Sequence, residues 1–170
     1  MLIFLRNSEY EKITYEYPIA AAKAFATLNS PKPFKFVYVS GEGTTTTPGM
    51  FTPFFGVVKG RAEAALLCLS KEPGYELFKP YSLRPGGVDP TYHPEIKEFI
   101  PVKQGLAKKG EELLVPLLRK VYPGMISPTK DLARVLTDLA AGDGEPLEGK
   151  GVDGEGRTIA NVGMRRLAGI

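Results

Sequence analysis

Apolar positions along this 170-residue chain follow a helical spacing first and a strand-like spacing next. The stretch Ser8–Glu11 has the form of a capping box, which predicts the start of a helix, and apolar residues then recur at helical spacing as far as Leu28. Pro18 interrupts this pattern and predicts a kink or two abutting helices. Residues 34–40, FKFVYVS, are almost continuously apolar, which is typical of a strand buried on both faces of a parallel sheet.

A strand–helix–strand unit is predicted over the following part of the chain. Between Pro53 and Lys71 the sequence is rich in alanine and leucine, which favours a helix, and Pro73-Gly74 ends it. Residues 78–87, FKPYSLRPGG, then predict a second strand that stops at Arg84-Pro85-Gly86-Gly87. Such a βαβ unit is right-handed almost without exception. The pattern therefore predicts an α/β fold with a parallel sheet and flanking helices.

The rest of the chain gives a less regular pattern. Residues 88–109 are predicted to be loop with one short helical turn, and Glu111–Val121 is predicted to be a helix. Ser127 and Pro128 form a good cap and first-turn pair for a further helix. That helix carries the clearest apolar stripe of the sequence, made of Leu132, Val135, Leu136, Leu139 and Ala140. One more strand is predicted at residues 157–162.

Composition and charge narrow the class of protein. An apolar fraction of 43% and a charged fraction of 24% are ordinary for a globular protein, and the length predicts a single domain over residues 1–170. The net charge of +3 is not gathered into a basic stripe, which excludes a nucleic-acid footprint. No apolar run reaches the roughly 18 residues of a membrane-spanning helix, and no signal peptide is recognisable. We therefore expect a cytoplasmic protein without membrane contact.

Neither of the two residue types that most often bind metals offers a site. The single cysteine, Cys68, lies in the apolar stretch ALLCLS, so a buried and unreactive thiol is expected. The single histidine, His93, stands in PTYHPEI without the cysteines or carboxylates that a metal site needs. No metal is predicted.

The carboxyl ends of the two predicted parallel strands carry the candidate binding residues. The first strand ends in Ser40-Gly41-Glu42-Gly43, and the second ends in Arg84-Pro85-Gly86-Gly87. Ligands of open parallel sheets bind outside these ends, and glycines let the backbone approach a ligand closely. Two glycine-bearing turns on one rim favour a binding site over a pair of ordinary tight turns.

Ser40 and Lys59 give the strongest chemical signal. In dehydrogenases of the short-chain type, a strand-end serine polarises the substrate carbonyl, and a tyrosine one helical turn before a lysine acts as general acid or base. Spacing by four residues places the two side chains on one helix face. Here the residue four positions before Lys59 is Phe55, which keeps the ring and lacks the proton.

Taken together, FVYVSGEG, VKGRAEAALL, YSLRPGGV and SPTKDLARVL resemble the atypical short-chain dehydrogenase/reductase group. Within it, the chain is most similar to NmrA-like and nucleoside-diphosphate-sugar-epimerase-like proteins, which bind NAD or NADP. The resemblance implies that Ser40 and Lys59 occupy the catalytic positions. It also implies that the cofactor lies against Ser40, Gly41, Lys59, Arg84, Pro85 and Gly86.

Two departures from this group shape the functional prediction. Phe55 replaces the tyrosine, and the glycine-rich phosphate-binding half that opens such proteins is absent from this sequence. We therefore expect a partial Rossmann-type fold, the C-terminal part of an NAD(P)-binding domain, that is weakly active or inactive as an oxidoreductase or epimerase-like enzyme. The alternative is a non-enzymatic module that senses the dinucleotide or binds a protein. An incomplete sheet would expose an edge for self-association or partner pairing.

Overall fold

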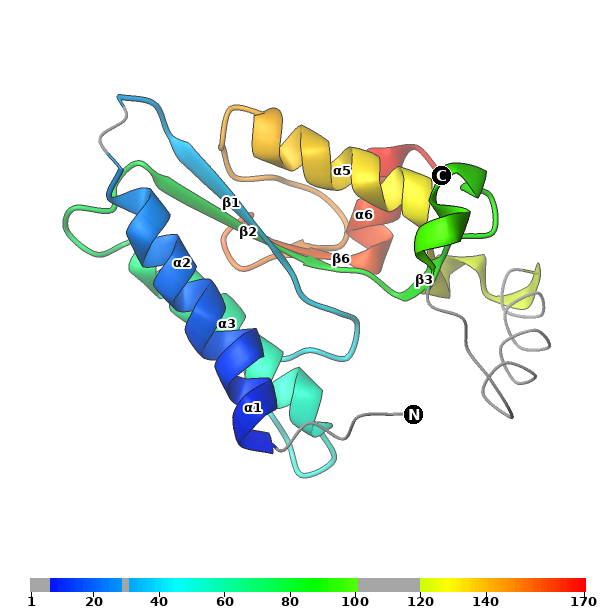
Figure 1. Ribbon diagram of the computed structural model, residues 1–170, viewed down its shortest axis with the longest axis horizontal. Helices are drawn as coiled ribbons and strands as arrows, with labels where there is room; N and C mark the ends of the chain where they lie inside the picture. Colours follow the sequence, from blue (N-terminus) through cyan, green and yellow to red (C-terminus); the bar gives the residue numbers. More distant parts are fainter. Residues whose placement is uncertain (1–6, 29–30, 101–119) are drawn as a thin grey trace.

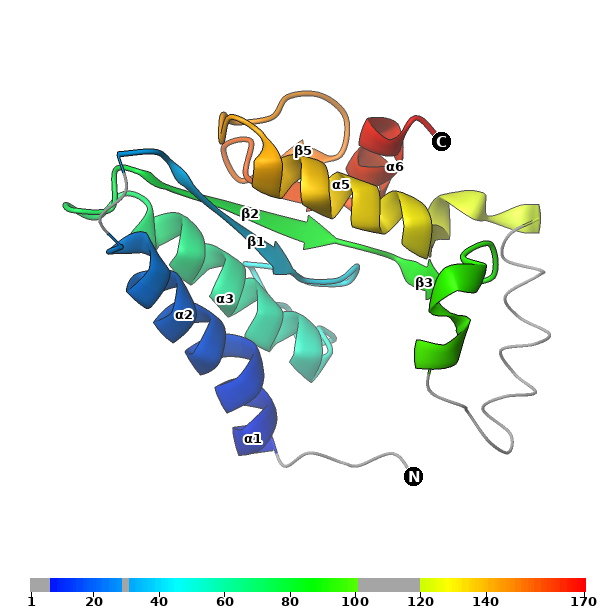
Figure 2. The ribbon, with the colours of Figure 1, turned by 45° about the horizontal axis from the view of Figure 1, so that its top comes forward.

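The computed structural model describes residues 7–28, 31–100 and 120–170. Figures 1 and 2 show a sheet with α2 and α3 on one face and α5 and α6 on the other. The helices and helical turns are α1 (Asn7–Glu11), η1 (Lys12–Glu16), α2 (Tyr17–Ala26), α3 (Phe54–Leu69), η2 (Pro94–Phe99), η3 (Pro123–Met125), α5 (Thr129–Ala141) and α6 (Asn161–Ala168). The strands are β1 (Phe34–Val39), β2 (Phe78–Arg84), β3 (Gly87–Asp89), β4 (Ile126–Pro128), β5 (Val152–Asp153) and β6 (Thr158–Ala160).

The main sheet has the strand order β1-β2-β6-β5. Strands β1, β2 and β6 are parallel, with Phe34 opposite Phe78 and Val39 opposite Leu83, and the short β5 is antiparallel to β6. Strands β3 and β4 form a separate parallel pair. This mixed α/β arrangement, with a parallel-rich sheet flanked by helices, confirms the predicted fold class. Among the described residues, β1 pairs on one side only and so forms an edge of the sheet.

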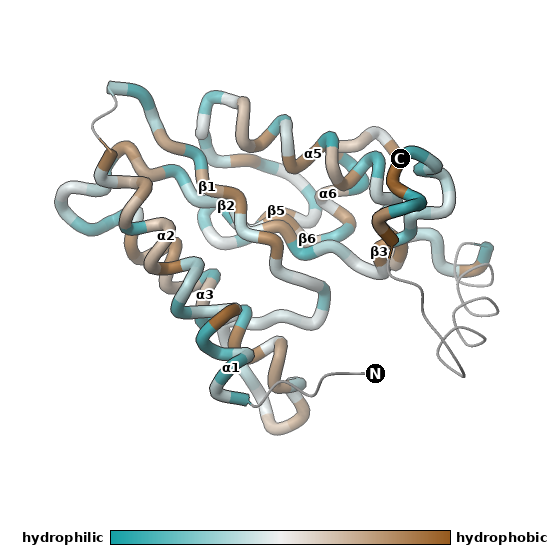
Figure 3. The backbone as a smooth tube through the Cα atoms, viewed as in Figure 1, coloured by the Kyte–Doolittle hydropathy of each residue, from teal (hydrophilic) through white to brown (hydrophobic). Residues whose placement is uncertain are grey.

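Each face of the sheet has its own apolar core. The aromatic side chains of β1 and β2 pack with α2 and α3 in one cluster, which contains Ala22, Tyr38, Ala62, Leu66, Leu69 and Phe78. The cluster beneath α5 and α6 contains Tyr81, Leu83, Leu132, Val135, Leu139, Ile159, Met164 and Ala168. Figure 3 shows hydrophobic segments in the strands between these helices. Alternate residues of β2 thus serve opposite cores, as strand geometry requires.

Pro18 shapes the first helix in a way that the sequence only partly predicts. The helical path continues through α1, the π-helical turn η1 and α2, and Tyr17 donates its N–H to the carbonyl of Lys12, five residues back. Proline has no N–H for the carbonyl of Thr14, which would be its helical partner. That carbonyl instead accepts a hydrogen bond of 3.0 Å from the hydroxyl of Tyr38 in β1. The carbonyl that Pro18 leaves without a helical donor thus links the helix to the edge strand β1.

Two local expectations are wrong. Cys68 is exposed rather than buried, because α3 buries the face that carries Val58, Ala62 and Leu66. Ser127 is not a helix cap, since it lies in β4 and its hydroxyl bonds elsewhere. The second predicted strand, in contrast, stops at Arg84 as expected, and Pro85 and Gly86 separate β2 from the short β3.

Other expectations are confirmed in part or lie outside the described residues. The helical turn within residues 88–109 is present as η2, and the predicted strand at 157–162 is shorter, because α6 begins at Asn161. The predicted helix Glu111–Val121 lies almost entirely outside the described residues. Within the described ranges, no helix is long and apolar enough to cross a membrane, and no three metal-binding side chains come together.

Candidate functional site

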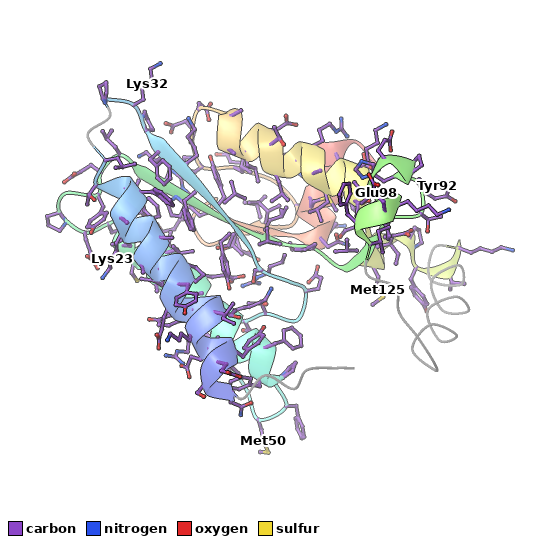
Figure 4. All side chains as sticks on the ribbon, viewed as in Figure 1. Lys23, Lys32, Met50, Tyr92, Glu98 and Met125 are labelled. Carbon is purple, nitrogen blue, oxygen red and sulfur yellow. The ribbon has the colours of Figure 1, made fainter. Side chains whose placement is uncertain are left out.

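A groove of about 650 Å³ lies at the carboxyl ends of β1 and β2. It is lined by Val39, Ser40, Gly41, Glu42, Pro85, Gly86, Gly87, Val88, Gly124 and Met125. Met125 is labelled in Figure 4, beside the small β3–β4 sheet. The structure thus brings together the two glycine-bearing turns of the sequence prediction and adds a third wall from η3. A site in this position is the usual one for an open parallel sheet.

Two glycines of the groove have different reasons to be glycine. A Cβ on Gly86 would stand 2.3 Å from the carbonyl oxygen of Met125, so this turn closes onto η3 only because the side chain is missing. A Cβ on Gly41 would meet nothing within 4 Å. The space above Gly41 therefore belongs to the groove and leaves room for a ligand against the backbone.

Ser40 lines the groove but is only 3% exposed. Its hydroxyl donates to the hydroxyl of Thr44, four residues further along the loop, at 3.2 Å. Its N–H continues the β1–β2 ladder to the carbonyl of Leu83 at 2.8 Å. The side chain is thus held in place at the end of β1, where the predicted polarising serine is expected.

Lys59 supports the same strand end from α3 rather than from inside the groove. Its Nζ donates to the carbonyl oxygens of Ser40 at 2.7 Å and of Val39 at 3.2 Å. Burial lowers the pKa of Lys59 below its ordinary value, and the negative charge of Glu63, one turn along α3, partly offsets this. Lys59 is absent from the lining of the groove, so its present contacts are those of a structural clamp on the Ser40 backbone.

The loop after β1 lies directly on α3 because of two glycines four residues apart. A Cβ on Gly60 would stand 1.8 Å from the carbonyl oxygen of Thr45, and one on Gly56 would stand 2.5 Å from that of Gly43. Phe55 borders the same loop and is 40% exposed. Its ring tip would lie 3.7 Å from a Cβ on Gly43, so the residue at the tyrosine position contacts the loop rather than the groove.

Arg84 forms a buried ion pair instead of lining the groove. Its Nε donates to Glu63 Oε1 at 2.9 Å, and its Nη2 makes a second contact with Glu63 Oε2. The side chains of Arg84 and Glu63 are 16% and 1% exposed. Hydrogen bonding to Glu63 raises the pKa of Arg84 above its ordinary value. The pair fastens the carboxyl end of β2 to α3, just below the Pro85-Gly86 turn.

A network of buried polar groups holds three walls of the groove together. Asn161 donates its backbone N–H to Glu42 Oε1 at 3.0 Å and its side-chain Nδ2 to the carbonyl of Gly124 at 2.6 Å. The hydroxyl of Ser127 donates to Asn161 Oδ1 at 2.6 Å and accepts the N–H of Gly86 at 2.9 Å. Every buried side-chain nitrogen and oxygen of the described residues has a hydrogen-bond partner.

Sequence reasoning gave Asn161, Ser127 and Glu42 no role in the site. Asn161 follows β6, which is the third parallel strand, so the rule that selected the residues after β1 and β2 would have found it. Ser127 was taken for a helix cap, and Glu42 stood within the glycine-bearing turn without a role. Of the predicted residues, Ser40, Gly41, Pro85 and Gly86 line the groove, whereas Lys59 and Arg84 stand behind it.

Comparison with known proteins finds relatives that are named as biosynthesis-cluster proteins. It is 41% identical over 158 residues to botcinic acid biosynthesis cluster B protein 16 of Botryotinia fuckeliana, and the match covers 89% of this chain and 98% of that protein. The chain belongs to the family of this protein. It is also 31% identical over 181 residues to leucinostatins biosynthesis cluster protein T of Purpureocillium lilacinum, covering 96% of this chain and 65% of the relative.

Neither a family model nor a solved structure matches the chain. The family is therefore shown by sequence identity to botcinic acid biosynthesis cluster B protein 16. That relative has nearly the extent of this chain, whereas leucinostatins biosynthesis cluster protein T continues beyond the match.

Proposed function

We propose that this protein is a short-chain-dehydrogenase-like, NAD(P)-binding protein of the NmrA-like and epimerase-like type, and that its residues correspond to the C-terminal part of a Rossmann-type domain. The observation that carries this proposal is the groove between the two glycine-bearing turns, at the carboxyl ends of adjacent parallel strands. In this proposal the groove receives the nicotinamide end of the cofactor, and the protein is cytoplasmic.

The residues of the groove fit a flat ring better than a phosphate. Open space above Gly41 and the apolar walls of Val39, Val88 and Met125 would accept an aromatic ring, and backbone groups of the glycine turns could bond its carboxamide. Among the described residues, the lining of the groove contains no lysine or arginine. The pyrophosphate would therefore need contacts outside this groove, and binding by this chain alone should be weak.

The cofactor would supply the hydride. The residues of this chain would position the substrate, but they offer no evident proton donor. Ser40 stands where a carbonyl would be polarised, and Lys59 fixes the Ser40 backbone. The tyrosine position holds Phe55. Tyr38 does not replace it, because its hydroxyl donates to Thr14 and burial raises its pKa well above the ordinary value near 10. We therefore propose weak or absent oxidoreductase activity, and dinucleotide sensing as the non-enzymatic alternative.

Titration of the purified chain with NADH and NADPH tests the proposal. We expect dissociation constants in the range of about 0.1 to 1 mM by calorimetry or fluorescence, because the described residues of the groove offer the pyrophosphate no basic side chain. Gly41→Val should weaken binding at least about tenfold by filling the groove. The matched control is Gly49→Val, since a Cβ at Gly49 also meets nothing within 4 Å but lies outside the groove. Equal affinities for the two variants, or no binding at millimolar cofactor, would refute the proposal.

A second candidate function, protein interaction, is favoured by the edge strand β1. Phe34 and Ser40 donate their N–H groups to β2, so the intervening odd-numbered residues direct theirs away from it. We propose that a second copy of this chain pairs there. Light scattering after size exclusion should show a dimer for the wild type and a monomer for Lys35→Pro, which removes an outward N–H. Lys35→Thr keeps this N–H and should remain dimeric. A monomeric wild type would refute this candidate.

A further inference from the structure

Four large apolar side chains are exposed together where the loop after β1 enters α3. Met50 and Phe51 are 92% and 94% exposed, and Phe54 and Phe55, in the first turn of α3, are 43% and 40% exposed. We call these four residues the apolar tip. Figure 4 shows the labelled Met50 at the outermost point of this loop, with its side chain directed away from the molecule. A single exposed apolar side chain is common, but a group of this kind marks a contact surface.

A hydrogen-bonded turn holds the outer part of the apolar tip in place. The N–H of Thr52 donates to the carbonyl of Gly49 at 3.1 Å, and the N–H of Gly49 donates to the hydroxyl oxygen of Thr52 at 2.9 Å. Met50 and Phe51 therefore occupy the two central positions of a β-turn, where glycine, proline, asparagine, aspartate and serine are the usual residues. Large apolar side chains contribute nothing to such a turn, so their presence is better explained by contact with another surface.

The apolar tip fits a lipid surface because its insertion would bury few polar groups. Residues 43–58 contain no charged side chain, so the tip can leave water without burying an ion. Pro48 and Pro53 have no backbone N–H, and those of Gly49 and Thr52 are already bonded within the turn. Few backbone donors would therefore lose a water partner, as a nonpolar medium requires. Lipid also deforms around a projecting loop, whereas a protein partner would need a hollow of matching shape.

The charges beside the tip favour a lipid surface without net charge. The ring of Tyr10 in α1 packs on Phe54 with centroids 5.8 Å apart. Tyr10 stands between two glutamates, and the second of them, Glu11, pairs with Arg61 of α3. These residues form no excess of positive charge, which is what attracts a protein to anionic lipids. Zwitterionic headgroups, which carry no net charge, are therefore the matching surface.

We propose that the apolar tip binds the surface of a zwitterionic lipid membrane, with Met50 and Phe51 inserted among the acyl chains next to the headgroups. The contact is peripheral, and it goes beyond the proposed function without depending on it. The expectation of no membrane contact concerned membrane-spanning helices and signal peptides, and neither feature bears on a surface contact of this kind. Insertion is driven by the apolar area of the two side chains, so its strength should not depend on salt.

Flotation of the full chain with phosphatidylcholine vesicles measures the partition of the protein onto lipid. We expect the wild type to bind equally at about 0.1 M and about 1 M salt, because no ionic attraction contributes. The double variant Met50→Ser with Phe51→Ser should lower the partition coefficient at least about tenfold, because the inserted side chains supply the binding.

The matched control for flotation is Phe99→Ser, which should bind as the wild type does. Phe99 is 75% exposed at the end of η2. Figure 4 labels Glu98 of the same turn, well away from Met50.

A tryptophan at the tip reports its insertion, because the chain itself contains no tryptophan. The emission of Phe51→Trp should shift to shorter wavelength when the same vesicles are added, and phosphatidylcholine with brominated acyl chains should quench it. Phe99→Trp should show neither change.

Four results would overturn the inference. The first is a wild type that does not float with the vesicles, which would leave a groove on another protein as the partner of the tip. The second is flotation that disappears at the higher salt concentration, and the third is equal flotation of the wild type and the double variant. The fourth is a wavelength shift in both tryptophan variants or in neither.

Discussion

The two ends of the central strands β1 and β2 are built from different kinds of residue. At the amino ends, the rings of Phe34, Phe36 and Phe78 pack with centroids 5.9 to 6.4 Å apart. At the carboxyl ends, the glycine turns are held by one buried ion pair, Arg84–Glu63, and by hydrogen bonds. Along each strand, apolar packing at the amino end therefore gives way to polar contacts at the carboxyl end. The comparison teaches that the amino ends supply stability and that the carboxyl ends supply the shape of the groove. Substitutions at the two ends test this division, from the largest expected effect to the smallest.

Phe78→Ala should cause the largest loss of stability. The side chain is 1% exposed at the centre of the amino-end cluster, and its removal should lower the free energy of unfolding by about 3 to 5 kcal/mol. Urea unfolding followed by circular dichroism measures this loss. Phe51→Ala serves as the control, because that ring is 94% exposed, and it should stay within about 0.5 kcal/mol of the wild type. A loss below 1 kcal/mol for Phe78→Ala would break the comparison.

Glu63→Gln should come next, because it leaves the buried guanidinium of Arg84 without its charge partner. We expect a loss of about 3 kcal/mol. The exposed pair Lys71–Glu155 gives the control, and Glu155→Gln should change stability by less than about 0.5 kcal/mol. The double variant Glu63→Leu with Arg84→Met should be more stable than Glu63→Gln if the cost comes from the unpaired charge. An equal or lower stability of the double variant would contradict this explanation.

Gly60→Ala tests whether the loop after β1 depends on contact with the α3 backbone. Alanine in a helix interior normally stabilises by about 1 kcal/mol relative to glycine. Here the new methyl group would meet the carbonyl of Thr45, so we expect a loss of about 1 to 3 kcal/mol instead. Gly49→Ala, which has open space, is the matched substitution and should be nearly neutral. Thermal unfolding of the two variants decides the sign, and a stabilised Gly60→Ala would show that the loop is free to lift.

Tyr38→Phe should give the smallest effect, and one that depends on pH. The hydroxyl donates to the Thr14 carbonyl, so its loss should cost about 1 kcal/mol at pH 7. Because folding raises the pKa of Tyr38, mainly through burial, the unfolded chain ionises first as the pH rises above 10. The stabilisation is therefore complete below pH 10 and is lost above it. Unfolding free energies measured from pH 7 to 11 should converge for wild type and variant, and parallel curves would contradict the pKa shift.

Sequence reasoning reached the βαβ unit because its signals are local. The continuous apolar run of β1, the alanine-rich α3 and the glycine turns at both strand ends each follow from neighbouring residues. The same holds for the stripe of α5, which buries Leu132, Val135 and Leu139 as predicted.

The missed features depend on contacts that are distant in sequence. Asn161 meets Glu42 across 119 positions, and Ser127 meets Gly86 across 41, so neither partner can be inferred from spacing. The short helix α6 was missed because Gly163 lowers helix propensity, yet its Cβ would clash with the carbonyl of Gly151 at 2.5 Å. The assignment of the groove to NAD(P) remains a proposal, since it comes from the resemblance of short motifs.

The break between β2 and β3 has a mechanical consequence. The backbone passes from the main sheet into the small β3–β4 sheet through Pro85 and Gly86, and the groove lies beside this connection. Val39 belongs to the main sheet, and Val88 belongs to the small sheet. A rotation of the small sheet about this connection would change the width of the groove, and it would have to break the hydrogen bonds that join Ser127 and Gly124 to Asn161. The distance between spin labels at Val39 and Val88 would report the width of the groove directly.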